Sequence, residues 1–149
     1  MNFTPSPYSR KLPHFDVGQE YYHLVFRLAE GYLTETEIEI VRELIVSGNS
    51  KFYRLIAVQV MSNHVHILLQ PSLGYTLARI MGGIKGVSAH KLNISRGTKG
   101  TIWLDKYFDR IIRNQDDFEK TLRYLEQNPI KADASEEAWK YLGWQFLQE

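Results

Sequence analysis

The sequence predicts an α+β fold, the ferredoxin-like (RRM-like) arrangement in which an antiparallel four-stranded sheet carries two helices on one face. Short runs rich in aromatic and β-branched residues alternate with longer stretches whose apolar residues recur at helical spacing. The first six elements follow the order βαββαβ, and a third helix and a further short helix come after them. The length of 149 residues predicts one domain over residues 1–149, with an extended, proline-containing arm over residues 1–18.

The first half of the chain is expected to form three strands and one helix. Residues 21–28 (YYHLVFRL), 53–60 (YRLIAVQV) and 64–70 (HVHILLQ) have the apolar, β-branched and aromatic composition that is typical of strands. Residues 34–46 carry apolar side chains at helical spacing behind a capping box, which predicts a helix. The three residues between the second and third strands are few enough for a hairpin.

The middle of the chain is expected to form a second helix and a fourth strand. Residues 72 to about 93 carry an apolar stripe that predicts the helix, although three glycines within it lower its helix propensity. Residues 94–100 (ISRGTKG) indicate a basic loop, and residues 107–113 (YFDRIIR) indicate the strand.

The third helix is predicted over residues 116–127. Asp116 and Glu119 form a capping pattern at its start, and Pro129 is expected to end it. Residues 135–147 could form a last, short helix.

The composition excludes several kinds of site. The absence of cysteine rules out disulfides and thiolate metal sites, which leaves His, Asp, Glu and amide side chains as possible metal ligands. No apolar run approaches the ~20 residues that a membrane-spanning helix needs, and residues 1–13 contain no apolar signal-peptide core. We therefore expect a cytoplasmic protein with no membrane partner.

Positive charge is concentrated in the middle of the chain. Residues 72–113 contain eight Lys and Arg against two Asp, although the whole chain has a net charge of only +1. A basic segment fits a phosphate-rich partner, but it fits a solvated polar surface at least as well. The candidate contacts to such a partner are Lys85, Lys91, Arg96, Lys99, Arg110, Arg113 and Arg123. Each of them, taken alone, is more simply a solvated charge.

The most informative motif is His64-Val65-His66 on the third predicted strand. Because side chains alternate along a strand, both imidazoles lie on one face and Val65 lies on the other. Two imidazoles about 6–7 Å apart along a strand can converge on one metal ion. We expect this site on the exposed face of the sheet, near the start of the strand. Because short motifs also occur by chance, the pair could equally be two unrelated polar residues on a half-solvated strand. Two histidines alone do not hold a catalytic ion, so a further ligand is needed.

A second candidate lies on the third predicted helix, whose apolar stripe is Phe118, Leu122 and Leu125. Tyr124 lies about 130° away from that stripe, and Asn128 follows one turn later on the same face. A tyrosine hydroxyl can act as a covalent nucleophile, and an asparagine oxygen is a suitable ligand for Mg²⁺ or Mn²⁺. Alternatively, Tyr124 packs with its tip in water and Asn128 caps the helix end.

Together these motifs resemble the HUH single-tyrosine transposases, the group that includes the IS200-like and REP-associated tyrosine transposases. The resemblance rests on MSNHVHILL over residues 61–69 and RYLEQNPIKA over residues 123–132, with aromatic residues between them at Trp103, Tyr107 and Phe108. It covers roughly residues 21–132, and the order of the elements agrees. The chain departs from many relatives at position 62, where they have proline and it has serine.

The resemblance implies a single HUH domain that nicks single-stranded DNA near hairpins and transfers the strand with a divalent metal ion, Mg²⁺ or Mn²⁺. His64 and His66 would bind the metal, and Asn128 matches the position of a third ligand. Tyr124 would be the nucleophile that forms a 5′-phosphotyrosine. Members of the family often act as homodimers, and the basic residues named above would then contact DNA.

Other proteins share parts of this pattern. A histidine-triad nucleotide hydrolase would need a third histidine at position 68, where this chain has leucine. A single-strand RNA-binding module of the same fold would carry a basic-aromatic signature that these strands lack. A catalytically degenerate, single-stranded nucleic-acid-binding protein of the same fold is the main alternative. It would have lost His64, His66 or Tyr124, and all three are present.

Overall fold

The computed structural model describes residues 20–131 and 145–146. Its elements in chain order are β1 (Tyr21–Arg27), α1 (Glu35–Ser47), β2 (Tyr53–Val60), β3 (His64–Pro71), α2 (Leu77–Arg96), β4 (Phe108–Ile112), α3 (Gln115–Lys131) and β5 (Gln145–Phe146).

The strands form one antiparallel sheet in the order β4-β1-β3-β2-β5, so β1 and β3 lie at its centre. The predicted ferredoxin-like α+β fold is therefore confirmed, with β5 added at one edge. In the pairing of the two central strands, Val25 lies opposite His66, and His23 lies opposite Leu68. This register brings the histidine of β1 into the neighbourhood of the histidine pair on β3.

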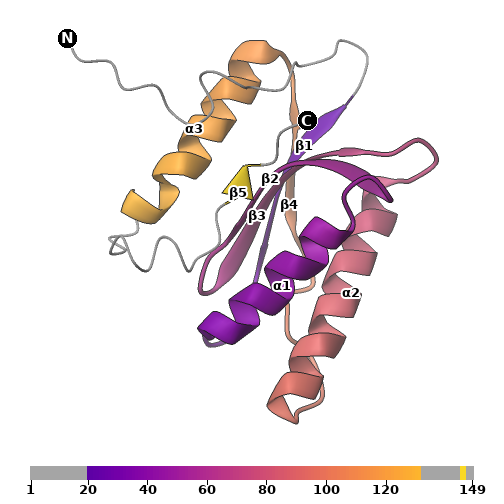
Figure 1. Cartoon of the computed structure of the whole chain (residues 1–149), viewed down its shortest axis with the longest axis vertical. Coiled ribbons are helices and arrows are strands. Elements are labelled where there is room, and N and C mark those ends of the chain that lie inside the picture. The colour runs from indigo at the N-terminus through magenta and orange to yellow at the C-terminus, as the bar shows by residue number, and fades with distance from the viewer. Residues whose placement is uncertain (1–19, 132–144, 147–149) are drawn as a thin grey trace.

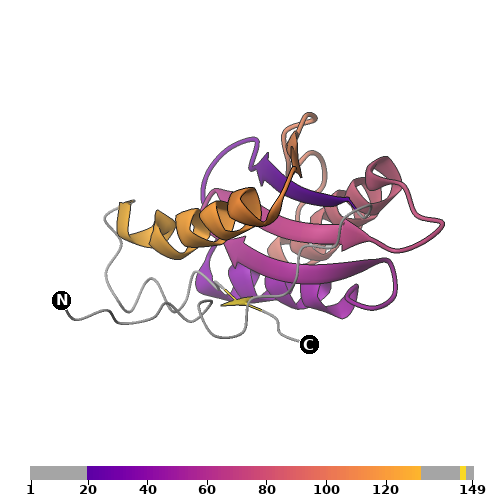
Figure 2. The same ribbon diagram turned by 90° about the horizontal axis from the view of Figure 1, so that it is seen from above.

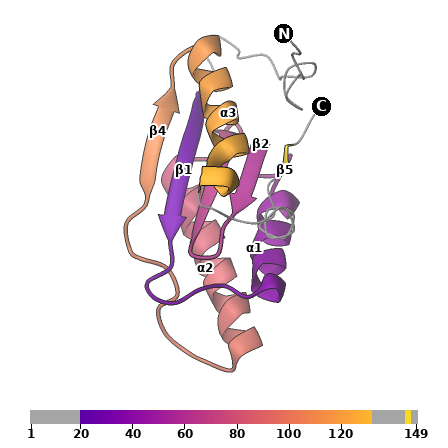
Figure 3. The same cartoon turned by 90° about the vertical axis from the view of Figure 1, so that its left-hand side faces the viewer.

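Helices cover both faces of the sheet. α1 and α2 lie side by side on one face, and α3 lies across the other (Figures 1 and 2). The larger hydrophobic core lies beneath α1 and α2 and includes Val41, Ile45 and Ile84. A separate, smaller core lies beneath α3 and includes Phe118 and Leu122. Figure 3 looks onto the α3 face, with β4 at one edge of the sheet and β5 at the other.

α2 differs from its prediction at both ends. It begins at Leu77, because the Thr76 hydroxyl accepts a backbone N–H in the first turn and caps the helix there. It ends at Arg96, because Gly97 adopts a left-handed φ of 68° that glycine reaches without steric cost. Residues 72–76 therefore precede the helix, and the first three residues of the predicted basic loop belong to it.

α3 begins one residue earlier than predicted, because Asn114 caps it in place of Asp116. The Asn114 Oδ1 accepts the Asp117 N–H at 2.8 Å. At the other end the helix continues through Pro129 to Lys131, so the prediction that Pro129 ends the helix was wrong. A proline removes one backbone donor from a helix, and here the helix continues because another group replaces that donor, as described below.

Two predictions lie wholly or largely outside the described residues, namely the arm over residues 1–18 and the last helix over residues 135–147. Of that helix only Gln145 and Phe146 are described. They form β5, which pairs with β2 at Ala57 and Val58, so the helix prediction was wrong at these two positions. Within the described ranges, every helix is too short or too polar to cross a lipid bilayer.

Candidate active site

β3 brings the two predicted metal-binding histidines to the face of the sheet that α3 covers. Val65 points into the core beneath α1 and α2, and His66 points to the opposite side. The rings of His64 and His66 lie 5.0 Å apart between centroids and are nearly perpendicular. His64 is half-buried at the start of the strand, and His66 is buried. The site thus lies on the expected side of the sheet, but α3 covers that side and leaves it less exposed than expected.

One nitrogen of each histidine has a neighbour that fixes the ring. The Nδ1 of His64 lies 2.7 Å from the Oδ1 of Asn63. An amide oxygen only accepts hydrogen bonds, so with this partner the Nδ1 of His64 carries the proton. The Nδ1 of His66 lies 3.0 Å from the Nε2 of His23, which reaches across from β1. Because both contacts engage Nδ1, a metal ion would coordinate Nε2 of each ring.

The surroundings keep these three histidines neutral. Burial, with smaller contributions from the neighbouring His23, His64 and Arg27, lowers the pKa of His66 to about 3. Burial lowers the pKa of His23 to about 4, with a smaller contribution from Arg110. Burial and Arg27 also lower the pKa of His64. A neutral imidazole is the form that binds metal ions, so the site is suited to a metal at neutral pH.

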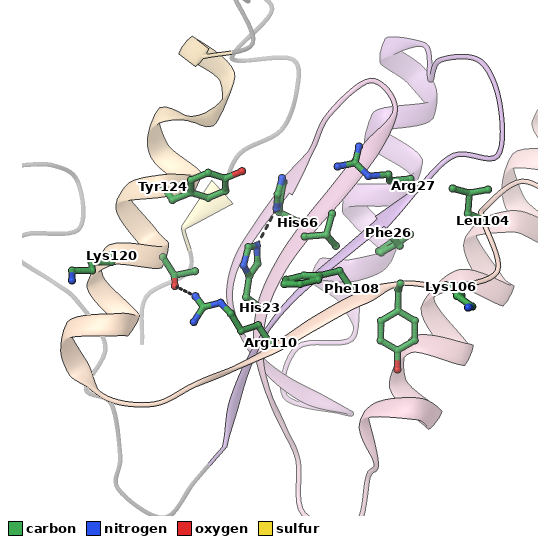
Figure 4. Close-up of a pocket in the computed structure, with 13 residues that line it drawn as sticks. His23, Phe26, Arg27, His66, Leu104, Lys106, Phe108, Arg110, Lys120 and Tyr124 are labelled. Atoms are coloured by element: carbon green, nitrogen blue, oxygen red, sulfur yellow. Dashed lines mark hydrogen bonds between the residues drawn. The ribbon is translucent and has the colours of Figure 1, made fainter.

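Tyr124 lies on α3 above the same histidines. Phe118, Leu122 and Leu125 form the buried stripe of this helix, whereas Tyr124 is 43% exposed. Its ring centroid lies 5.9 Å from that of His66 and 6.3 Å from that of His23. The position of Tyr124 away from the apolar stripe therefore leaves its ring partly exposed beside the histidines (Figure 4).

A polar contact between β2 and α3 holds the helix beside the sheet at this point. The buried Gln59 donates from Nε2 to the carbonyl oxygen of Leu125, the residue after Tyr124, at 2.6 Å. In an α-helix this carbonyl would accept the N–H of residue 129, which is proline and has none. Gln59 therefore supplies the hydrogen bond that Pro129 cannot. Because Gln59 belongs to β2, this bond also attaches α3 to the sheet.

Asn128 lies in α3 one turn after Tyr124, and its side chain is outside the described part of the chain. The helix runs three residues past Asn128, so the alternative prediction that Asn128 caps the end of the helix was wrong. Among residues 20–131 and 145–146, no group of three or more His, Asp or Glu side chains could hold a metal ion. Asn128 stays the predicted third ligand.

A pocket of about 760 Å³ opens between β1, β4 and α3 and contains His23, His66 and Tyr124 in its wall. Its cationic side chains are Arg27, Lys106, Arg110 and Lys120. Phe108, which is 54% exposed, stands at the same wall with its ring edge-on to His23. Figure 4 shows Phe108 and Arg110 beside His23, with Lys106 and Lys120 at opposite sides of the view.

Three of the predicted basic contacts lie on β4, on α3 or at the turn between them. Arg110 lines the pocket, and its guanidinium is held by Asp117 at 2.9 Å and by the Thr121 hydroxyl at 2.8 Å. Arg123 is exposed on α3 next to Tyr124, 3.6 Å from Glu119. Arg113 is exposed at the turn between β4 and α3.

The other predicted basic contacts belong to α2 or to the loop after it, across the sheet from Tyr124 (Figure 2). Lys85 donates to the carbonyl oxygens of Leu104 and Asp105, at 2.7 and 2.8 Å, and so ties the loop to the helix. Arg96 pairs with Glu37 of the α1 capping box and lowers the pKa of that carboxyl. Lys91 and Lys99 are exposed there. Lys91, Arg96 and Lys99 therefore lie away from the tyrosine site, whereas Lys85 contacts Leu104 and Tyr107, which line its pocket.

Several residues of the site were not predicted from the sequence, chiefly His23, Gln59 and the cations at positions 27, 106 and 120. Phe108 was named only among the aromatic residues of the family resemblance. Alternation along β1 was a usable signal for His23, because it places that side chain on the face opposite Leu24 and Phe26. Only the register between β1 and β3 shows that it meets His66.

Comparisons with known proteins bear on the family and the fold of this chain. The chain matches the family model of IS200-like transposases over residues 16–128. Among solved structures, it is similar to a REP-associated tyrosine transposase bound to a REP hairpin, with 20% identity and a TM-score of 0.65 over 82% of this chain and 73% of that one. A candidate transposase from Deinococcus radiodurans R1 is 19% identical, with a TM-score of 0.49 over 85% of this chain and 97% of that one. A comparison with the curated proteins finds no significant match.

The identity to the REP-associated tyrosine transposase is low, so the likeness to it concerns the fold. The family match is broader evidence, because it spans most of the chain and includes β3 with its histidine pair and α3 up to Asn128. The chain belongs to the IS200-like transposase family of DNA-processing enzymes.

Proposed function

We propose that this protein is a metal-dependent enzyme that nicks single-stranded DNA and transfers the strand, with Tyr124 as its nucleophile. The observation that carries the proposal is the placement of Tyr124 on α3. Its ring lies 5.9 Å from that of His66, and the residue is 43% exposed in the wall of a cationic pocket. A nucleophile needs both a reachable hydroxyl and groups that neutralise the charge of a phosphate, and this position offers both.

His64, His66 and Asn128 would hold the divalent ion, Mg²⁺ or Mn²⁺. The two histidines fit this role, because their Nδ1 atoms are engaged by neighbours and their pKa values are lowered by burial. Asn128 follows Tyr124 by one helical turn, and its amide oxygen would add the kind of ligand that both ions prefer. When bound, the ion polarises the phosphoryl group that is attacked.

The reaction is a transesterification with Tyr124 as the entering group. Its hydroxyl loses a proton to solvent, and the Oη forms a bond to the phosphorus while the bond from phosphorus to the 3′ oxygen breaks. The 3′ oxygen takes up a proton and leaves as a hydroxyl, and the DNA remains joined to Tyr124 through its 5′ phosphate. Because water does not enter the reaction, a different 3′ hydroxyl can attack the phosphotyrosine and complete strand transfer.

The pocket also supports single-stranded DNA as the partner. Its cationic side chains suit a phosphate backbone, and the exposed ring of Phe108 suits stacking of a base. We favour Arg27, Lys106 and Lys120 as the first contacts, because they line the pocket that contains Tyr124, whereas the α2 cations do not line it. A hairpin-bearing strand is the proposed substrate, since the REP-associated transposase of similar fold is bound to a hairpin.

The test is covalent capture of DNA on a denaturing gel. Labelled single strands drawn from the flanks of the gene, with hairpins included, are incubated with Mg²⁺ or Mn²⁺ and protein. We expect the wild type and Tyr32→Phe, a change at a 72% exposed tyrosine elsewhere, to give a protein–DNA adduct and a nicked strand. We expect Tyr124→Phe to give neither. Nicking that survives in Tyr124→Phe would overturn the assignment of the nucleophile.

A further inference from the structure

The contact between His23 and His66 joins two imidazoles from different strands. The Nε2 of His23 lies 3.0 Å from the Nδ1 of His66, and both residues are buried at 7% and 4% exposure. A histidine that meets another histidine has no fixed role, because either nitrogen can carry the shared proton. The direction of this hydrogen bond therefore decides which nitrogen of His66 is left with a lone pair.

The geometry of the contact indicates a hydrogen bond rather than a shared metal ion. The ring planes differ by 19°, and the centroids are 5.2 Å apart, which exceeds the nitrogen–nitrogen distance by about two ring radii. The two nitrogens therefore point at each other along a nearly straight line. A metal ion needs bonds of about 2.0–2.1 Å to each imidazole nitrogen, so it does not fit on a straight line of this length, whereas a proton does.

Only one direction of this hydrogen bond is compatible with a metal on His66. If His23 donates, the remaining proton of a neutral His66 sits on Nε2, and no ring nitrogen of His66 can coordinate. If His66 donates from Nδ1, its Nε2 carries a lone pair. His64 reaches the same state through Asn63, whose amide oxygen can only accept.

We propose that His23 is a positioning residue of the metal site, which accepts the Nδ1 proton of His66 and so keeps His66 Nε2 unprotonated and correctly aimed. This inference rests on the proposed function, because it assumes that His66 binds a metal ion. His23 then does for His66 what Asn63 does for His64. Outer partners of metal-binding histidines commonly fix ring orientation and tautomer in this way.

The inference can be tested by metal binding in the absence of DNA. Affinity for Mn²⁺ is measured by electron paramagnetic resonance or calorimetry in the wild type, His23→Phe and His23→Gln. Phenylalanine keeps a planar ring but has no acceptor, whereas glutamine can place an amide oxygen near the position of the lost Nε2. We expect affinity to fall about 10–100-fold in His23→Phe and to recover most of that loss in His23→Gln. His90→Phe, at an exposed histidine on α2, is the matched control and is expected to bind like the wild type.

A spectroscopic readout separates positioning from general damage. Long-range ¹H–¹⁵N spectra of histidine-labelled protein with Mg²⁺ are expected to show His66 protonated on Nδ1 and His23 unprotonated on Nε2. Equal Mn²⁺ affinity in the wild type and His23→Phe would overturn the inference, and so would equal losses in both His23 variants. Absence of Mn²⁺ binding by the wild type would instead overturn the metal role in the proposed function, and this inference with it. Tyr124→Phe is expected to lose the DNA adduct but keep its Mn²⁺ affinity, which keeps the two failures distinct.

Discussion

The two faces of the sheet are built differently. The face beneath α1 and α2 is closed by a continuous apolar core with members from both helices and from the three strands β1, β2 and β3. The face beneath α3 has a smaller core, which packs the helix over one part of the sheet. Beside that core lie buried histidines, cationic side chains and an open pocket. Stability is thus concentrated on one face, and reactive groups are concentrated on the other.

The largest expected effect tests whether the core beneath α1 and α2 contributes mainly to stability rather than to activity. Ile45 of α1 is fully buried in the larger core, so Ile45→Ala leaves a cavity beneath the helix. We expect the free energy of unfolding to fall by about 2–5 kcal/mol, as measured by urea titration. The rate of adduct formation per folded molecule is expected to stay unchanged. A large loss of that rate in fully folded protein would show that the two faces are coupled.

The next effect concerns the pH dependence that the open face imposes on the metal-free protein. The pKa values of His23 and His66 are lowered to about 4 and about 3, so both stay neutral in the folded state while the unfolded state takes up protons below about 6.5. Stability is therefore fully present above pH 6.5 and falls as the pH drops toward 4. Each histidine contributes a slope of up to about 1.4 kcal/mol per pH unit in that window.

This pH dependence is measured by urea titrations at a series of pH values without metal. The double variant His23→Gln/His66→Gln is expected to flatten the slope between pH 6.5 and 4, and His90→Gln is the surface control. Asp117 and Glu37, whose pKa values are lowered by their arginine partners and backbone donors, lose stabilising charge only at more acidic pH. A slope that is unchanged in the double variant would contradict the burial of these histidines.

The two motifs of the site were predictable because each is encoded locally. Alternation along β3 fixes the faces of His64 and His66, and the angle between Tyr124 and the apolar stripe of α3 follows from helical spacing. The same local patterns gave the four strands and three helices. They misplaced the starts of α2 and α3, because capping by Thr76 and Asn114 competed with other plausible caps nearby. They misplaced the far end of α3, because Gln59, distant in the sequence, replaces the donor that Pro129 lacks.

The remainder of the site depends on partners that are distant in the sequence. His23 reaches His66 only through the register of β1 against β3, and no pattern within β1 encodes that register. The cations of α2 looked suited to DNA because their charges are close in sequence. Lys85 and Arg96 instead bond to Leu104 and Glu37, which only the folded chain brings near.

A smaller effect is expected at the contact that attaches α3 to the sheet. Gln59→Leu removes the donor to the Leu125 carbonyl. That carbonyl has no intrahelical donor, because the residue four positions later is Pro129, which lacks an N–H. A buried carbonyl without a donor costs about 1–3 kcal/mol, and we expect a loss of unfolding free energy in that range. Adduct formation is also expected to slow, because Tyr124 is next to Leu125, which Gln59 would no longer hold.

A double-mutant cycle provides the control for Gln59. Pro129→Ala restores a backbone N–H at the position that bonds the Leu125 carbonyl in a regular helix. Gln59→Leu is therefore expected to cost less in a Pro129→Ala background than in the wild type. Equal costs in both backgrounds would show that the glutamine does not substitute for the missing N–H.

The smallest expected effect concerns DNA affinity at the rim of the pocket. Phe108 is 54% exposed on the site face of β4, and Ile111 is 45% exposed on the same strand but points to the other side. Stacking of one base on an aromatic ring contributes about 1–3 kcal/mol, so Phe108→Ala is expected to weaken binding of a single strand by about 5- to 150-fold. Ile111→Ala removes a similar apolar surface and is expected to leave affinity unchanged. Fluorescence anisotropy at fixed salt measures both, and equal losses in the two variants would mean that affinity depends on the apolar surface of β4 rather than on the face that carries Tyr124.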